Sequence, residues 1–330
     1  MATATLLLTR RDVAGLLDLA ECIDAVESSF RCHGEGTAPA PAVTGMDAQG
    51  GGFHVKVASL ALSRPYFAAK VNANFPGNGA RHGLPTIQGA VVLFDAEAGR
   101  VLALLDSIEI TIQRTGAATA VAAKYLARRV ASVVTVCGCG VQGRVQLRAL
   151  SRVRSLRRVL AWDQEPDRAA VYAREMEAEL GVTVQPVATP RAGTEESDVV
   201  LTCTSASQWF LGRGDVRAGT FVAAVGADNE HKQEIEPELL AQCTVVADVL
   251  SQAATMGDLH HALDAGLMTR DQVHAELGQI VAGKKPGRRN GEEIIVFDST
   301  GTALQDVAAA AVVYERALAT GAGVQVMLGG

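Results

Sequence analysis

The stretch from Ser132 to Asp163 decides the fold. It runs S-V-V-T-V-C-G-C-G-V-Q-G-R-V-Q-L-R-A-L over 132–150 and, after a basic turn, ends R-R-V-L-A-W-D at 157–163. The short β-branched run at its start is typical of a buried parallel strand. Three glycines, Gly138, Gly140 and Gly143, then follow with the spacing G-x-G-x-x-G. A helical pattern comes next, and a second short apolar run ends in Asp163.

This arrangement predicts a dinucleotide site. Gly138 would allow the tight turn, Gly140 would let the backbone approach a pyrophosphate, and Gly143 would let helix and strand come close. The start of the helix offers N–H groups and a positive dipole end to the phosphates. An ordinary glycine-rich turn is the alternative, since the chain has 33 glycines. The strand before the motif, the helix after it and an acid about twenty residues further on favour the nucleotide interpretation.

The acid that ends the second strand bears on the choice of cofactor. A carboxylate at this place accepts hydrogen bonds from ribose hydroxyls and repels a 2′-phosphate. Asp163, followed by Gln164, therefore favours NAD over NADP. Arg168 lies a few residues on and could soften that preference.

Length and composition indicate a two-domain, water-soluble enzyme. The chain has 330 residues, 48% hydrophobic and 20% charged, which is ordinary for a globular protein with a large core. The net charge of −6 gives no reason to expect nucleic acid or an anionic membrane as a partner. We expect no transmembrane helix and no secretory signal. Six scattered cysteines without a C-x-x-C pair are typical of reduced thiols, so we expect a cytoplasmic protein.

The first third of the chain predicts two helices and an antiparallel sheet. Thr9 and Asp18 each begin a helical pattern with an acid three residues later, and the second pattern extends to about Arg31. Glycine, alanine and proline interrupt the pattern as far as Gly52. Alternating runs then cover 53–60, 66–75, 86–95 and 100–106, separated by turn residues. Polar residues that a plain strand would not require lie within them: His54, Lys56, Lys70, Asn72 and Asn74.

The rest of the chain predicts an α/β nucleotide domain of the Rossmann type. An alanine-rich helix is expected over 108–129, directly before the Ser132 strand. Further strands are expected at 182–187, 198–202, 220–225, 244–248 and 294–298, which with the helices between them indicates a doubly wound parallel sheet. A last helix over 303–319 would return to the first domain. We therefore expect a substrate-binding and dimerisation domain of α+β type at 1–118 with 303–330, and a dinucleotide-binding Rossmann domain at 119–302. Residues 283–291, G-K-K-P-G-R-R-N-G, are expected to form a loop.

Two cations are candidates for substrate contacts. Lys70 lies in the apolar segment A-A-K-V-N; if its ammonium is partly desolvated, its pKa is lowered and it can exchange protons near neutral pH. The alternative is a lysine on an edge strand that points to solvent. Arg114 lies among small residues, and its planar guanidinium can hold a carboxylate in a bidentate fork. We expect the small residues at 116–118 to leave room for the ligand.

Polar residues at strand ends are candidates for acid–base chemistry and cofactor contacts. Asp228 follows the expected strand at 220–225, and ligands in open α/β sheets bind outside the carboxyl ends of the strands. Its alternative role is the N-cap of a helix around 232–240. Thr202, Thr204, Ser205 and Ser299 also follow strands and can bind ribose or an amide. We expect no metal, since the adjacent His260 and His261 should point to different sides of a helix and the other histidines are scattered.

Taken together, these segments resemble the ornithine cyclodeaminase/mu-crystallin family over nearly the whole chain. The matching segments are A-A-K-V-N-A-N-F-P-G-N, G-L-P-T-I-Q-G, D-S-I-E-I-T-I-Q-R-T-G-A-A-T-A-V-A-A, G-C-G-V-Q-G, A-V-G-A-D-N-E-H-K-Q-E-I and F-D-S-T-G. Members include ornithine and lysine cyclodeaminases, alanine dehydrogenases and reductases of cyclic ketimines. The resemblance implies a homodimer whose first domains pair in a shared barrel-like core, with a nucleotide domain on each side.

The resemblance also implies residue roles. Lys70 matches the active-site lysine, Arg114 the carboxylate-binding arginine and Asp228 the catalytic aspartate. Positions where members contact the dinucleotide are occupied here by Thr86, Val141, Gln142, Asp163, Thr204, Val225, Lys232 and Ser299. With these we assign to the cofactor site Arg114, Thr115, Gly138, Gly140, Gly143, Thr202 and Gly226.

One departure from the family pattern concerns the reaction. Cyclodeaminases usually carry an arginine after the second helix and an M-P motif with a nearby acid that handles the side-chain amine. Here no arginine lies between Gly34 and Ser63, and His54 and Lys56 stand in the place of the acid. Lys56 could hold the substrate carboxylate, but it would repel the ammonium of ornithine.

We therefore expect an NAD(H)-dependent oxidoreductase at the Cα–N bond of a small α-amino acid or its imine, with Lys56, Lys70 and Arg114 on the carboxylate and Asp228 exchanging the proton. The alternatives are an ornithine-type cyclodeaminase, which is a lyase, and a crystallin-like binding protein without turnover.

Overall fold

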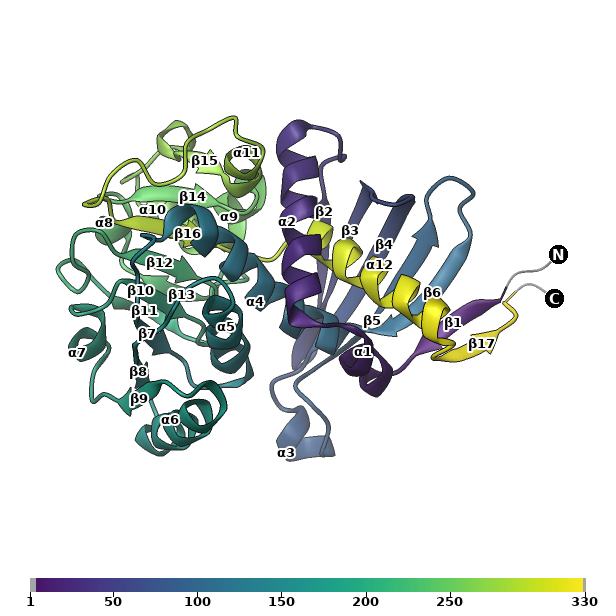
Figure 1. Ribbon diagram of the computed structural model, residues 1–330, viewed down its shortest axis with the longest axis horizontal. Coiled ribbons are helices and arrows are strands. Elements are labelled where there is room, and N and C mark those ends of the chain that lie inside the picture. Colours follow the sequence, from purple (N-terminus) through teal and green to yellow (C-terminus); the bar gives the residue numbers. More distant parts are fainter. Residues whose placement is uncertain (1–3, 329–330) are drawn as a thin grey trace. The chain divides into compact units, whose positions relative to one another are not determined.

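The structure is a computed structural model that describes residues 4–328 (Figure 1). The chain divides into two compact units. The first takes in the described parts of Met1–Arg114 and Thr302–Gly330, and the second is Thr115–Gly301. The division falls within one helix, α4 (Ser107–Leu126). No helix in the described part of the chain is both long and apolar enough to span a membrane.

The first unit is built on a seven-stranded sheet in the order β17-β1-β6-β5-β4-β3-β2. All neighbours are antiparallel except β1 and β6, which are parallel. Helices α2 and α12 pack against each other, and α12 lies along β3 and β4 (Figure 1). The strands are β1 (Thr5–Leu8), β2 (Ala42–Ala48), β3 (Gly51–Ala61), β4 (Pro65–Asn74), β5 (Ile87–Asp95), β6 (Val101–Asp106) and β17 (Val324–Val326). The helices are α1 (Arg10–Leu16), α2 (Leu19–Glu35), α3 (Asn78–His82) and α12 (Ala303–Thr320).

Both predicted helix starts are confirmed in this unit. Thr9 caps α1 and forms a capping box with Asp12. Asp18 caps α2 and accepts hydrogen bonds from the amides of Ala20 and Glu21. The interruption expected between the helices and Gly52 is wrong in part, because 42–48 forms strand β2. Its backbone pairs with β3 from Ala42↔Val57 to Ala48↔Gly51, and this pairing overrides the weak strand preference of the segment.

The second unit contains an eight-stranded sheet in the order β15-β14-β16-β12-β10-β7-β8-β9, in which every pair is parallel. The predicted doubly wound Rossmann-type sheet is confirmed. Its strands are β7 (Val133–Cys137), β8 (Arg158–Trp162), β9 (Thr183–Pro186), β10 (Val199–Thr202), β12 (Phe221–Ala224), β14 (Thr244–Ala247), β15 (Ala275–Glu276) and β16 (Ile295–Asp298). A separate pair is formed by β11 (Ser207–Leu211) and β13 (Gln233–Ile235).

Helices connect these strands. They are α5 (Val141–Ser151), α6 (Pro166–Leu180), α7 (Pro190–Thr194), α8 (Pro237–Leu240), α9 (Leu250–Met256), α10 (Asp258–Asp264), η1 (Arg270–Gln272) and α11 (Leu277–Val281). Strands β7, β10 and β12 are buried along their whole length, as expected for a sheet covered on both faces.

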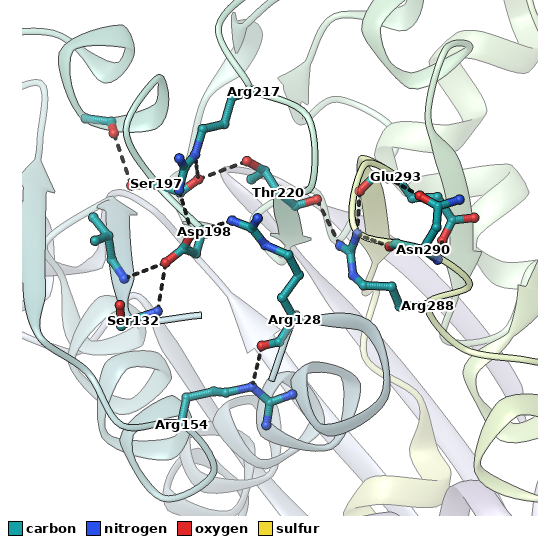
Figure 2. Close-up of polar contacts among 12 residues, drawn as sticks. Arg128, Ser132, Arg154, Ser197, Asp198, Arg217, Thr220, Arg288, Asn290 and Glu293 are labelled. Atoms are coloured by element: carbon teal, nitrogen blue, oxygen red, sulfur yellow. Dashed lines mark hydrogen bonds and ion pairs between the residues drawn. The ribbon is translucent and has the colours of Figure 1, made fainter. Parts of the chain in front are cut away.

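Arginine side chains form hydrogen bonds and ion pairs at the amino ends of the strands of this sheet (Figure 2). Asp198 accepts hydrogen bonds from the amides of Ser132 and Val133, and it pairs with the guanidinium groups of Arg128 and Arg217. Arg154 donates to backbone carbonyls in the last turn of α4 and just beyond it, where helix carbonyls lack partners. The 283–291 segment is a loop, as predicted, and Arg288 ties it to the carbonyls of Leu126 and Thr220.

Candidate functional site

The turn between β7 and α5 is shaped by its glycines. Gly138 has a φ of +102°, a conformation that L side chains rarely adopt, and a Cβ there would lie 2.7 Å from the Cys203 carbonyl oxygen. A Cβ on Gly143 would lie 2.2 Å from the Gly138 carbonyl oxygen. Both positions therefore require glycine for close packing of strand, turn and helix, as the fingerprint predicts.

The middle glycine of the motif, Gly140, faces open space. Among residues 4–328, a Cβ on Gly140 would meet nothing within 4 Å, and no side chain caps the start of α5, where Gly140 is the N-cap. A cavity of about 850 Å³ opens here, lined among others by Gly138, Gly140, Val141, Gln142, Asp163 and Thr204. The uncapped N–H groups and this cavity fit a pyrophosphate at the helix start.

Asp163 has a structural partner in the glycine turn. Its Oδ2 accepts a hydrogen bond from the Cys139 amide at 2.8 Å, and its Oδ1 accepts one from the Glu165 amide at 3.0 Å. The carboxylate thus lies on the cavity wall, a place that disfavours a 2′-phosphate. Arg168, which could soften this preference, is paired with Glu165 at 3.0 Å.

The thiols of Cys137 and Cys139 at the turn are buried, and the nearby Cys203 is half-buried. Burial raises the pKa of Cys139 to about 12 and the pKa of Cys137 and Cys203 well above the ordinary value. Thiols with raised pKa values are poor nucleophiles.

Several predicted cofactor residues lie at the carboxyl ends of neighbouring strands. Thr202 ends β10, Val225 and Gly226 follow β12, and Ser299 follows β16. The side-chain oxygen of Ser299 is buried and has no hydrogen-bond partner among residues 4–328. An unpaired buried hydroxyl is costly unless a ligand completes it, so this position suits a ligand contact.

Asp228 lies in the loop after β12 and is not a helix N-cap. The helix expected around 232–240 is wrong: the chain forms strand β13 and then the short helix α8, whose N-cap is Glu236. The Asp228 side chain is 53% exposed, and its Oδ1 lies 2.7 Å from the ammonium nitrogen of Lys232. The alternative role of Asp228 as a helix N-cap is therefore wrong, and its catalytic role stays a prediction.

Lys70 lies on β4 between β3 and β5, so it is not an edge-strand lysine. Its side chain is 3% exposed, and its ammonium nitrogen lies 2.7 Å from Asp306 Oδ2. Burial lowers the pKa of Lys70 to about 7, although the neighbouring Asp306 carboxylate opposes this change. The expected desolvated lysine, able to exchange a proton near neutral pH, is present.

Arg114 is bound to the same carboxylate. Its Nε donates to Asp306 Oδ1 at 3.1 Å and its Nη1 donates to Gln305 Oε1 at 2.9 Å. The expectation that small neighbours leave room for a ligand is wrong for Gly116, whose Cβ would lie 3.0 Å from Val145 on α5. The small residues there serve helix packing.

Sequence reasoning missed Asp306, the centre of this cluster. It lies on the first turn of α12, is 1% exposed, and has its pKa held below the ordinary value by Lys70 and Arg114 despite burial. The only signal in the sequence is the polar pair Gln305–Asp306 directly before the apolar run at 307–313. Buried acids are rare unless they are paired, so this pair could have been noticed.

Lys56 belongs to the same group of charges. It stands directly opposite Lys70 in the β3–β4 register, and its charge lowers the pKa of both Lys70 and Asp306. Like charges opposite each other in a sheet are destabilising. Three cations around one carboxylate leave a positive excess, which suits an anionic group of a ligand.

The remaining predicted residues are placed as follows. Thr86 is exposed in the loop before β5, where its carbonyl accepts from the Phe75 amide. Thr115 is 8% exposed on α4. His260 and His261 do not point apart as expected, because their ring centroids are 3.8 Å from each other. Within the described residues, no group of three or more His, Cys, Asp or Glu side chains is arranged to hold a metal ion.

Comparison with known proteins agrees with this fold. The sequence profile of the ornithine cyclodeaminase/mu-crystallin family matches residues 3–321. The chain is 38% identical to an alanine dehydrogenase of Archaeoglobus fulgidus over 320 residues, which cover 97% of each protein. The chain belongs to the ornithine cyclodeaminase/mu-crystallin family, as predicted.

Solved structures agree with this assignment. An archaeal alanine dehydrogenase dimer with bound NAD superposes with a TM-score of 0.94 at 36% identity, covering 99% of this chain and all of that one. The Δ1-pyrroline-2-carboxylate reductase of Thermococcus litoralis, in complex with NADH and L-proline, gives 0.91 at 33% identity over 98% and 100%. A lysine cyclodeaminase gives 0.84 at 30% identity over 99% and 96%.

Proposed function

We propose that this protein is an NAD(H)-dependent oxidoreductase that acts on the Cα–N bond of a small α-amino acid or its imine. The observation that carries the proposal is the buried cluster of Lys70 and Arg114 on one carboxylate, Asp306, with Lys56 opposite Lys70. This positive excess suits the carboxylate of an amino or imino acid. The names of the alanine dehydrogenase and pyrroline-2-carboxylate reductase relatives bear out the predicted class.

Each residue has a proposed part in the reaction. In the reductive direction the C=N bond gains a hydride at Cα and a proton at nitrogen, which leaves a C–N single bond. Lys56, Lys70 and Arg114 hold the carboxylate and fix the orientation of Cα. Asp228 exchanges the proton with nitrogen, directly or through water. Preorganised cations stabilise charge without reorganisation during the reaction.

The second unit would hold the cofactor, and NAD(H) supplies or accepts the hydride. The turn of Gly138, Gly140 and Gly143 and the start of α5 would bind the pyrophosphate. Asp163 would accept from the ribose hydroxyls and favour NAD over NADP. The other proposed contacts are Thr86, Arg114, Thr115, Val141, Gln142, Thr202, Thr204, Val225, Gly226, Lys232 and Ser299.

A second candidate is cyclodeamination, favoured by the likeness to a lysine cyclodeaminase. In that reaction the amino acid is oxidised, its side-chain amine displaces ammonia, and the hydride returns. The positive excess around Lys56 and Lys70 argues against it, because this charge would repel the side-chain ammonium of ornithine or lysine.

We also propose a homodimer in a reducing compartment such as the cytoplasm. The sheet face opposite α12 is apolar and partly open to solvent: on β3 and β4 it presents Phe53, which is 42% exposed, and Val71, which is 40% exposed. Contiguous exposed apolar surface is typical of an interface, and the archaeal alanine dehydrogenase of similar fold is a dimer. All six cysteines are free thiols, as expected inside a reducing compartment.

Two measurements test the proposal. The chain has two tryptophans, Trp162 and Trp209, and both line the cavity at the glycine turn. Titration with NADH should therefore quench tryptophan emission and excite NADH emission by energy transfer. A screen of NADH oxidation with pyruvate plus ammonia or methylamine, Δ1-pyrroline-2-carboxylate and Δ1-piperideine-2-carboxylate should then find a substrate. Proline and ammonia formed from L-ornithine without net NADH would instead support cyclodeamination, and NADH binding without any turnover would support a binding protein.

A further inference from the structure

Glu234 is a buried carboxylate to which the proposed reaction gives no part. It lies on β13 and is fully buried. Its Oε1 accepts hydrogen bonds from the Thr204 amide at 2.6 Å and from the Thr204 hydroxyl at 2.7 Å. Its Oε2 accepts one from the Gly226 amide at 2.9 Å. One carboxylate thus joins the loop after β10 to the loop after β12.

The fit around this carboxylate is close. A Cβ on Gly226 would lie 2.4 to 2.5 Å from the carboxyl atoms of Glu234. Gly226 therefore needs to be glycine because of Glu234, whether or not a ligand touches it. Its φ is not in the left-handed region, so backbone conformation alone does not require glycine there.

Glu234 accepts three hydrogen bonds, and both of its carboxylate oxygens are used. Burial raises the pKa of Glu234, although hydrogen bonds from Thr202, Thr204 and Gly226 oppose this change. A second buried acid, Asp258, accepts from the amides of Glu234 and Ile235 through Oδ1. Burial and the charge of Glu234 raise the pKa of Asp258 to about 7.

The two loops lie on the side of the sheet that would serve the nicotinamide. In the order β12-β10-β7-β8, the glycine turn follows β7 and Asp163 follows β8. In a doubly wound sheet these two strands serve one mononucleotide, and the strands beyond the first serve the other. Thr204 and Gly226 follow β10 and β12, so they belong with the nicotinamide half.

We propose that Glu234 is the positioning residue of the nicotinamide half: it holds the Thr204 and Gly226 loops in the arrangement that receives the ring and its ribose. This inference rests on the proposed function. In this proposal Glu234 fixes the positions of two loops, and the loop that contains Gly226 leads directly to Asp228.

The test uses Glu234→Gln in the full-length protein. A glutamine side chain has nearly the same volume, but it has one acceptor oxygen where Glu234 has two, so it cannot serve both loops. Glu236→Gln is the matched control. Glu236 lies two residues away and accepts from the Arg213 amide in another loop.

The first readout needs no cofactor. In the apoprotein, hydrogen exchange followed by mass spectrometry should show at least tenfold faster exchange in peptides covering 203–206 and 225–228 of Glu234→Gln. Peptides from β7 and β10 should be unchanged, and Glu236→Gln should match the wild type in all of these peptides. Unchanged exchange in both loops would overturn the proposal that Glu234 holds them in place.

The second readout compares NADH with ADP-ribose, which lacks the nicotinamide ring. Glu234→Gln should weaken NADH binding by at least about tenfold and leave ADP-ribose binding within about twofold. Equal losses for both ligands, or a lower melting temperature with unchanged NADH affinity, would reduce Glu234 to a structural role and overturn the proposal. If Glu234→Gln does not fold, Glu234→Asp keeps the charge but is too short to reach both loops, and the same comparison applies.

Failure of the proposed function gives a different result. A wild-type protein that binds neither NADH nor ADP-ribose would refute the nucleotide site and, with it, the positioning role of Glu234. The exchange experiment would still show whether Glu234 holds the two loops. A wild-type protein that binds both, with a variant that loses neither, would refute only the inference about Glu234.

Discussion

Replacing Asp306 by asparagine should destabilise the first unit and change how it responds to anions. The Asp306 carboxylate lies 2.7 Å from the Lys70 ammonium and 3.1 Å from the Arg114 Nε, and all three side chains are buried. Asparagine keeps the shape and one acceptor oxygen but removes the charge. Two buried cations then remain with no carboxylate between them.

The size of the effect follows from these contacts. At an effective dielectric constant of about 20, unit charges at these distances attract by roughly 5–6 kcal/mol per pair, and desolvation offsets part of this. Breaking a buried pair by removing one partner costs about 3–5 kcal/mol. Part of that cost is relieved because the pKa of Lys70, already lowered to about 7, falls further and the amine becomes neutral. For a unit of this size we expect the melting temperature to fall by roughly 10 °C.

Thermal melts with added acetate and pyruvate are the assay. If Lys70 and Arg114 hold substrate carboxylates, a small carboxylate should restore part of the lost stability of Asp306→Asn and should stabilise the wild type less. The control is Glu179→Gln, which breaks the half-exposed pair of Arg148 and Glu179 and should cost no more than about 1 kcal/mol. A melting temperature of Asp306→Asn equal to that of the control would refute the reasoning.

Three further predictions concern other parts of the molecule. In the wild type, KM for the carboxylate substrate should rise as pH increases through about 7, because Lys70 loses its charge there. Lys70→Arg should abolish this rise of KM, since arginine stays protonated. The same pH profile in both proteins would contradict the role of Lys70. Asp228→Asn should reduce kcat by at least about 100-fold with NADH affinity unchanged, and near-normal turnover would exclude Asp228 as the proton donor. Arg154→Ala, which removes the donors at the end of α4, should cost about 2 kcal/mol in chemical denaturation without affecting NADH affinity, whereas exposed Arg152→Ala should cost little.

The fold could be predicted largely because its signals are local. The β-branched strand before Gly138, the spacing of the glycines and the acid at Asp163 all lie within one short stretch, and each has a mechanical reason. The capping residues Thr9 and Asp18 are equally local. Strand β2 was missed because its residues have weak strand preference, and it forms only by pairing with β3.

The chemistry of the site was predicted less completely. Lys70 and Arg114 stood out as charges among apolar or small residues, but their partner Asp306 lies far away in sequence on α12. Glu234 is surrounded in sequence by charged and polar residues and has the pattern of an exposed helix. It is buried only because tertiary contacts with Thr204 and Gly226 make it so. Contacts between distant segments leave no periodic trace in one sequence.

The two hydrogen bonds of Asp163 constrain any attempt to redesign the protein for NADPH. The obvious exchange for a small neutral residue would make room for another phosphate, but it would also leave the Cys139 amide without its acceptor. The turn that should bind the pyrophosphate would loosen at the same time, so affinity for both coenzymes would decline. A successful redesign would need a serine or asparagine that still reaches this amide, together with a new cation nearby.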